Sequence, residues 1–249
     1  MKQIYMLSLL LSICSSSLLA QTSSQPTGLQ LKGEWGLRGR WQTGNLSQIG
    51  INPYGRLTLM HPTYRSEWQV SYQYMNVSGF TVISDLWANG FHAISPQKRL
   101  HPLLAIYTGF AKSYKITESL VTGAGAELNL YQQSPMNFVR AHLFGGYMHV
   151  QFEQESPHTA LAVGTGIRSA FPLGKRIQLL WDFDTYHSTK ETAFWGANNR
   201  LVLLYPLFKG LSLNLSHTII FNNKTFPDLK KTNSLMQFGI QITHFSSKS

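Results

Sequence analysis

The segment LQLKGEWGLRGRW, residues 29–41, alternates between apolar or small side chains and mostly charged ones. Leu29, Trp35, Leu37 and Trp41 share one set of positions, whereas the charged residues occupy the other. Because successive side chains of a strand point to opposite faces, the alternation predicts a β-strand with one apolar and one charged face. At about 3.3 Å per residue such a strand is roughly 43 Å long, enough to cross a hydrocarbon core of about 30 Å when tilted. We therefore predict a membrane-spanning strand.

The composition fits one domain of this kind. The chain has 249 residues, of which 43% are hydrophobic, 12% aromatic and only 13% charged. Transmembrane barrels carry aromatic residues at both membrane interfaces, and their strands alternate rather than forming long apolar runs. No run of 18 apolar residues predicts a transmembrane helix.

The first 20 residues predict a secretory signal peptide. Lys2 precedes an apolar run at 6–13, and small residues follow at 15–20. Cleavage is expected after Ala20. A lipoprotein signal cut before Cys14 is the alternative, and in either case the exported chain has little or no thiol chemistry. Residues 21–28 are predicted to be a flexible lead-in, 29–245 the barrel and 246–249 a short tail.

The remaining sequence predicts an all-β fold, an antiparallel up-and-down transmembrane β-barrel of about 12 strands. The expected strands are 29–42, 46–60, 64–77, 80–95, 100–114, 116–132, 137–152, 158–172, 175–187, 192–207, 211–222 and 233–245. A soluble β-sandwich is the alternative, but it leaves the strand lengths and the export signal unexplained.

Every second predicted connection contains a proline. These prolines are Pro62, Pro96, Pro135, Pro172 and Pro206. Proline lacks an N–H and avoids central strands, so it fits short turns. Outer-membrane barrels have short periplasmic turns and longer external loops. The proline connections are therefore expected on the periplasmic side.

The formal net charge of +10 indicates that the chain binds negatively charged molecules. No nucleic-acid partner is predicted, because an exported chain without a basic helix gives no nucleic-acid signature. Outer-membrane lipid and lipopolysaccharide phosphates are the expected partners, and external lysines are candidates to bind them. Those lysines are Lys112, Lys115, Lys190, Lys224, Lys230 and Lys231. Near the C-terminus, Gln237, Gly239, His244 and Phe245 resemble the signal read by the barrel-assembly machinery.

Charged residues on the polar strand faces are expected to line the barrel interior. They are Lys32, Glu34, Arg38, Arg40, Arg56, Arg65, Glu67, Glu127, Arg140, His142, Arg168, Asp182, Asp184 and Arg200. Apart from the histidine, these are eight bases and five acids. Two interpretations stay open, a narrow pore that slightly favours anions and a plug of mutually paired charges. Asp182 and Asp184 are expected to pair with arginines, with a bound cation as the alternative.

The sequence predicts a protein that is not an enzyme and has no cofactor. Barrel lipid hydrolases carry a strand-borne His-x-Ser, and none of the nine histidines has a serine two residues later. Ser216 and His217 are adjacent and face opposite ways, whereas His187 and Ser188 lie at a loop edge. No metal-ligand spacing appears. A lipid-modifying hydrolase remains the alternative.

Several segments together resemble one bacterial family. They are TGN at 43–45, VTGAGAELNLY at 121–131, YPL at 205–207 and NNKTFPDLKKTNSLMQFGIQITHF at 222–245. Their order and spacing are similar to the family of salt-induced outer membrane proteins, a domain of unknown function. The resemblance covers about Trp35 to Phe245. Thr232 and Asn233 depart from it, since the family usually has an aspartate after the paired lysines. The resemblance implies a porin-like barrel in a Gram-negative outer membrane and no catalytic residues.

The expected function is structural, or that of a small-solute pore in the outer membrane. The alternatives are a lipid-modifying hydrolase and a closed barrel that binds lipopolysaccharide or a partner.

Overall fold

The strand predicted at the start of the chain forms β1, and eleven further strands follow it in the computed structural model. The structure describes residues 28–42, 48–77, 80–134, 136–174, 176–191, 194–224 and 231–247. The strands are β1 (Gln30–Gln42), β2 (Gln48–His61), β3 (Tyr64–Val77), β4 (Phe80–Ile94), β5 (Leu100–Ala111), β6 (Ile116–Ser134), β7 (Asn137–Phe152), β8 (His158–Leu173), β9 (Ile177–Ser188), β10 (Trp195–Phe208), β11 (Leu211–Asn222) and β12 (Thr232–Ser247). One 3₁₀ turn, η1 (Lys112–Tyr114), precedes β6.

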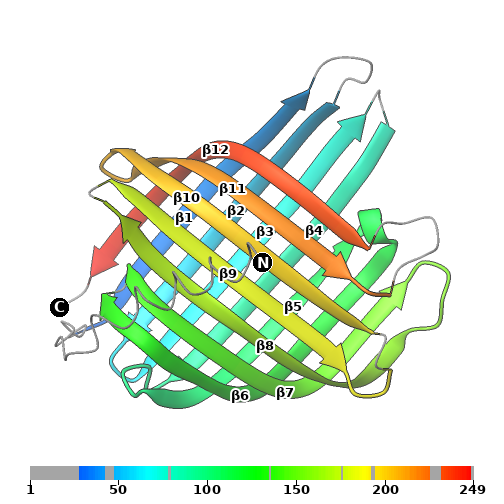
Figure 1. Ribbon diagram of the computed structural model, residues 1–249, viewed down its shortest axis with the longest axis horizontal. Helices are drawn as coiled ribbons and strands as arrows, with labels where there is room; N and C mark the ends of the chain where they lie inside the picture. Colours follow the sequence, from blue (N-terminus) through cyan, green and yellow to red (C-terminus); the bar gives the residue numbers. More distant parts are fainter. Residues whose placement is uncertain are drawn as a thin grey trace, which may run out of the picture.

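Each strand pairs antiparallel with the next, and β12 pairs with β1, so the sheet closes into a barrel (Figure 1). This confirms the predicted fold class and the number of strands. The strands run obliquely across the barrel, as the crossing of its near and far walls in the figure shows. Within the described residues, no helix is long and apolar enough to cross a membrane.

Predicted strand ends differ from the structure by at most three residues, and two of these differences have a structural cause. The strand expected to reach residue 114 ends at Ala111, because the next three residues form η1 and Lys115 takes a left-handed backbone with φ 54°. At the other end of the chain, β12 continues past residue 245, and Ser246 and Ser247 pair with the beginning of β1. The predicted signal peptide, residues 21–27 of the lead-in and residues 248–249 of the tail lie outside the described residues.

The connections divide between two rims. At the rim called the turn rim here, two to five residues separate consecutive strands, from β2–β3 to β10–β11. At the opposite rim, the loop rim, the separations are two to nine residues, with the longest between β11 and β12. Pro172 and Pro206 lie inside the ends of β8 and β10 rather than in the connections predicted for them. Both are exposed at strand ends, and the β10 pairing shifts register at Pro206.

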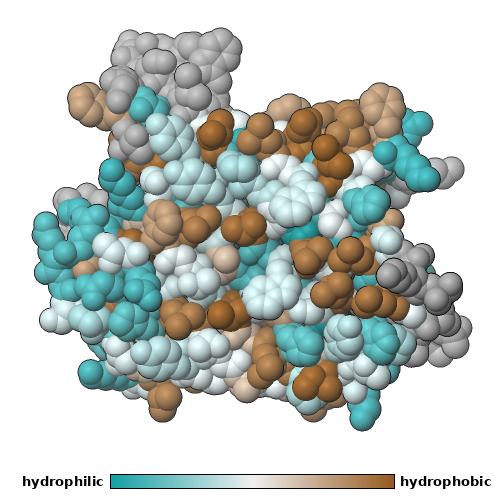
Figure 2. All heavy atoms as spheres, turned by 180° about the vertical axis from the view of Figure 1, so that it is seen from behind, coloured by the Kyte–Doolittle hydropathy of each residue, from teal (hydrophilic) through white to brown (hydrophobic). Residues whose placement is uncertain are grey.

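The two faces of β1 have opposite environments. Trp35 and Leu37 are 59% and 50% exposed on the outside of the barrel, whereas Glu34 and Arg38 are only 4% and 3% exposed. Other strands repeat the pattern. Large apolar side chains exposed elsewhere include Trp68, Leu104, Leu143, Leu161, Phe238, Ile240 and Ile242. Figure 2 shows such residues spread over the middle of one face, with hydrophilic residues gathered most clearly at its left end.

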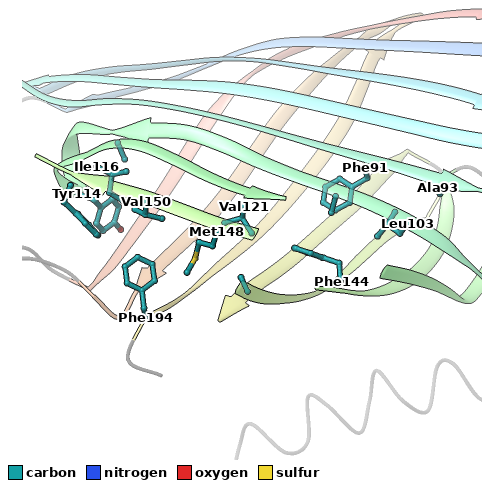
Figure 3. Packing of buried hydrophobic residues seen from close by; sticks show 14 residues of the cluster. Phe91, Ala93, Leu103, Tyr114, Ile116, Val121, Phe144, Met148, Val150 and Phe194 are labelled. Carbon is teal, nitrogen blue, oxygen red and sulfur yellow. The ribbon is translucent and has the colours of Figure 1, made fainter. Parts of the chain in front are cut away.

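Part of the interior is apolar. A cluster of buried side chains from β4 to β8 includes Phe91, Leu103, Phe144 and Met148, which lie along one side of the barrel in Figure 3. Glycine makes room where these strands bend closely together. A Cβ added at Gly146 of β7 would lie 2.0 Å from the Thr122 carbonyl oxygen. No other residue fits there without displacing the backbone.

Candidate functional site: a charged layer inside the barrel

Buried charges from strands on different sides of the barrel meet in its interior. The groups, called the charged layer here, are Lys32, Glu34, Arg56, Arg65, Glu67, Glu127, Arg140, Arg168, Asp182 and Arg200. Several of these ion pairs join strands that are not neighbours in the sheet, for example β2 with β9 and β3 with β7. In a closed barrel, such contacts cross the lumen.

One part of the charged layer is organised around Asp182 of β9. Its Oδ2 lies 3.2 Å from Arg56 Nη2, and the same oxygen accepts a hydrogen bond from Arg200. Arg56 also approaches Glu34 at 3.9 Å, and Lys32 Nζ lies 2.8 Å from the Glu34 carboxylate. Two carboxylates therefore hold three basic side chains in this part.

The other part is organised around Glu67 of β3 and Glu127 of β6. Glu67 accepts hydrogen bonds from Arg140 Nη1 at 3.2 Å and Arg168 Nη1 at 3.4 Å, and Arg65 Nε lies 2.7 Å from the same carboxylate as an ion pair. Glu127 pairs with Arg65 and receives further contacts from its surroundings. Those contacts are His101 Nε2 at 3.0 Å and Arg140 Nε at 4.0 Å. Each acid thus neutralises more than one base, and the bases outnumber the acids.

Asp184 makes its direct contacts with other groups than the predicted arginines, although its charge acts on the neighbouring Arg168. It lies 3.2 Å from His142 Nε2 and accepts a hydrogen bond of 3.0 Å from the Tyr107 hydroxyl. Asp182 pairs with two arginines as expected, but these partners of Asp184 are a histidine and a tyrosine. Among the described residues, no group of three or more His, Cys, Asp or Glu side chains could hold a metal ion.

Arg38 is buried without a carboxylate. Its Nε donates to Asn214 Oδ1 at 3.1 Å and its Nη1 to Asn52 Oδ1 at 3.4 Å. The guanidinium lies 3.8 Å above the ring of Tyr54. Within the described part of the chain, no acidic side chain forms an ion pair with Arg38. An unpaired charge in such surroundings is costly, and an anion from outside the chain would relieve that cost.

Three cavities follow one another along the lumen. The cavity towards the loop rim measures about 140 Å³ and is lined by Arg38, Tyr107, Tyr186 and Arg200 among others. The cavity towards the turn rim measures about 70 Å³, and the cavity between them about 20 Å³. That middle cavity is bounded by the charged layer and has room for about one water molecule. The smallest of these three cavities therefore lies within the charged layer.

The loop rim is partly covered from inside. Ser113 of η1 donates its backbone N–H to Asp85 Oδ1 at 3.1 Å, and its hydroxyl bonds the same carboxylate. Tyr114 is buried, and its hydroxyl reaches the Ile220 carbonyl of β11 at 3.4 Å. A contact between η1 and β11 spans the mouth, so η1 narrows the entrance above the 140 Å³ cavity.

The structure brings nearly all the predicted lumen charges into this region. The side chain of Arg40 lies outside the described ones. The other predicted groups are buried or half-buried, giving seven bases against five acids with His142 aside. Sequence reasoning missed the neutral partners, such as Tyr54, Asn214 and His101. Their roles depend on strand register, and residue type alone gave no signal for them.

No protein-family model matches this sequence, and no curated protein matches it. The fold is similar to several solved barrels. The translocator domain of the autotransporter NalP from Neisseria meningitidis has 11% identity and a TM-score of 0.41, over 96% of this chain and 95% of that one. The NanC porin has 11% identity and a TM-score of 0.45, over 89% and 100%. An anion-selective porin from Comamonas acidovorans has 9% identity and a TM-score of 0.36, over 88% of this chain and 99% of that one.

Proposed function

We propose that this chain is an outer-membrane β-barrel that passes small anions through a constricted lumen with an excess of positive charge. The observation that carries the proposal is Arg38, a buried arginine that lines the 140 Å³ cavity and has only neutral partners among the described residues. The proposal has two parts, the placement in a membrane and the selectivity of the lumen, and each part has its own test.

The outer surface supports membrane placement. The strands are 12 to 19 residues long, and about 9–11 residues suffice to cross a bilayer. Exposed Trp, Leu, Ile and Phe side chains lie on many strands, with buried charges behind them. Water-soluble proteins rarely expose contiguous apolar surface of this extent, whereas a barrel in lipid requires it.

The orientation follows from the two rims, because short turns lie on the periplasmic side of such barrels. Cysteine introduced at Glu155, at the loop rim, should react with a membrane-impermeant thiol reagent in intact cells. Cysteine at Gln97, at the turn rim, should react only after lysis. Both residues are exposed in the structure. Labelling of position 97 in sealed cells would reject this orientation.

The lumen charges support a preference for anions. Seven bases face five acids among the described side chains, and Arg38 is the base without an acidic partner. Rings of arginine and lysine lower the entry barrier for anions in pores. Because the middle cavity is only about 20 Å³, the expected conductance is small. A lumen sealed by its ion pairs is the competing interpretation.

Ion conductance across a planar bilayer distinguishes the two interpretations. The refolded protein should give small, anion-preferring currents. Arg38→Gln should keep the current and reduce the anion preference, more strongly at low salt because screening is weaker there. Arg176→Gln removes the same charge from an exposed turn and should leave the preference unchanged. Cation preference, or no current from a folded barrel, would contradict the proposal.

We also propose lipid and assembly partners. The exposed lysines of the loop rim, including Lys112 and Lys190, are placed to meet lipopolysaccharide phosphates if that rim is external. Among the residues proposed as the signal for the assembly machinery, Gln237 is buried in the finished barrel, whereas His244 and Phe245 are exposed. The proposed signal would therefore be read before β12 pairs with β1.

A further inference from the structure

A serine, a histidine and a glutamate meet at the loop rim, away from the charged layer. His158 begins β8, Ser188 ends β9, and Glu191 lies in the connection that follows. His158 Nε2 is 3.0 Å from Ser188 Oγ. On the other side of the ring, His158 Nδ1 is 3.6 Å from Glu191 Oε2. This is the order of contacts in which an acid orients a histidine that takes the proton of a serine.

We propose that Ser188 and His158 are the nucleophile and general base of a carboxylic-ester hydrolase site, with Glu191 as the residue that positions His158. The proposal is independent of anion passage. It departs from the expectation that the protein is not an enzyme. That expectation weighed serines next to a histidine or two residues after one, whereas Ser188 and His158 lie 30 positions apart on neighbouring strands.

The backbone holds the three residues in place. Ser188 pairs across the sheet with Ala162, and its backbone N–H donates to the Phe194 carbonyl at 2.9 Å. The Phe194 N–H in turn donates to the Glu191 carbonyl at 2.9 Å, which closes the connection around Glu191. Strand register and this hydrogen-bonded loop therefore place Ser188 and Glu191 on opposite ring nitrogens of His158.

The site is largely shielded from water. Ser188 is only 5% exposed. The ring of Phe194 stacks on the His158 imidazole with centroids 4.2 Å apart, and Phe152 meets Phe194 edge-on at 6.1 Å. Stacking fixes the plane of the imidazole. With Nδ1–H directed at Glu191, Nε2 is the nitrogen that accepts the serine proton.

Backbone donors surround the serine oxygen, and a lysine lies beside the glutamate. The backbone N–H groups of Lys190 and Glu191 lie 3.2 Å and 3.3 Å from Ser188 Oγ. Such donors favour negative charge developing on or beside this oxygen. Lys224 Nζ lies 3.5 Å from the Glu191 carboxylate. Lys224 also lies 3.9 Å from Glu155, so this lysine is shared by two acids, and the exposed Lys190 is the cation next to Ser188 in the chain that can meet a substrate. The substrate class that we propose is therefore a carboxylic ester with a negatively charged group that Lys190 can reach.

The reaction is an ordinary acyl transfer to water. Ser188 Oγ attacks the ester carbonyl carbon while its proton passes to His158 Nε2. The alcohol leaves with that proton, and the acyl group remains on Ser188. A water molecule then gives a proton to His158 and attacks the acyl carbon, which releases the carboxylic acid and returns the proton to Ser188. Water is the only co-reactant.

The competing explanation is a hydroxyl that merely organises the loop. The chain offers a matched comparison in His217 and Ser234, whose Nε2 and Oγ are 2.9 Å apart on β11 and β12. Among the described residues, no acid pairs with His217. If proximity of histidine and serine were sufficient, both serines would react alike.

The experiment uses the full barrel refolded in detergent. It is incubated with a fluorophosphonate probe, and the labelled peptide is identified by mass spectrometry. Hydrolysis of p-nitrophenyl butyrate is measured in parallel for Ser188→Ala, His158→Asn and Ser234→Ala. Retarded migration of the unheated protein in gels verifies that each variant is folded. Fatty-acid release from micelles of phosphatidylglycerol and of phosphatidylcholine tests the preference for a negatively charged ester.

We expect the probe on Ser188 and not on Ser234. Ser188→Ala and His158→Asn should each lower hydrolysis by about 10²–10⁴-fold, and Ser234→Ala should leave it unchanged. Glu191→Gln should lower the rate and Glu191→Asp should restore part of it, which a purely structural role of the loop would not produce. Phosphatidylglycerol should be cleaved faster than phosphatidylcholine. Absence of labelling and hydrolysis in the folded protein, or equal activity of Ser188→Ala, would overturn the proposal.

Discussion

Replacing Asp182 by asparagine tests whether the charged layer stabilises the barrel as a set of coupled ion pairs. The carboxylate of Asp182 contacts Arg56 at 3.2 Å and also binds Arg200. After Asp182→Asn, Arg56 keeps Glu34 at 3.9 Å, whereas Arg200 retains no carboxylate partner among the described residues. The variant therefore leaves a buried guanidinium uncompensated, and that is the source of the expected cost.

The magnitude follows from the burial of the pair. Removing one partner of a buried ion pair costs about 3–5 kcal/mol. The Asp182 side chain is 18% exposed and that of Arg200 11%, so partial solvation and the remaining Glu34 contact place the expected loss near the lower end, about 3 kcal/mol. Adding Arg200→Gln to the variant removes the orphaned charge and should recover about 1 kcal/mol or more.

Denaturant unfolding of the protein in lipid vesicles, followed by tryptophan fluorescence, measures these free energies. Glu118→Gln, which removes an exposed acid from β6, is the matched control and should change stability by less than about 0.5 kcal/mol. The reasoning fails if Asp182→Asn costs no more than this control. It also fails if the double variant is less stable than the single one, since the orphaned charge would then not be the cause.

Further predictions concern the outer face and the bent strands. Leu37→Arg puts a charge on the lipid side and should cost about 2–4 kcal/mol near mid-membrane, whereas Arg38→Leu exchanges a buried, unpaired charge for an apolar group and should be milder in refolding titrations. Equal costs would mean that the two faces are misassigned. Gly146→Ala should prevent refolding, because its Cβ would lie 2.0 Å from a backbone oxygen, while Gly145→Ala has no neighbour nearer than 4.0 Å and should refold normally. Gel mobility and far-UV circular dichroism would show both results, and a folded Gly146→Ala barrel would contradict the packing argument.

The strands could be predicted from the sequence because their evidence is local. Alternation in β1 separates Leu37 from Arg38, and the structure places the first outside and the second inside. The end of β5 could not be predicted in the same way. Tyr114 follows Lys112 and Ser113, and its side chain turns inward to reach β11, which alternation cannot reveal. A tertiary contact overrides the local pattern there.

The candidate sites were harder to predict from the sequence because they depend on the register in which the strands pair. The prediction that Asp184 pairs with an arginine rested on its position beside Asp182, whereas the structure puts the Tyr107 hydroxyl and His142 next to it. His158 and Ser188 show the same limit. Only the pairing of β8 with β9 reveals that they are neighbours, since nothing in their immediate sequence does.

The pairing of β1 with β12 has a consequence for how the barrel forms. Gln30 and Ser247 are partners in the sheet although almost the whole described chain separates them. Bringing such distant segments together carries a large loop-closure entropy, and contacts of this range slow folding. Until that seam joins, β1 and β12 would each present an unpaired edge able to capture another chain. A chaperone for the newly synthesised protein therefore matters most before β1 pairs with β12. A destabilising substitution in β12 should cause aggregation during assembly rather than lower the stability of the finished barrel.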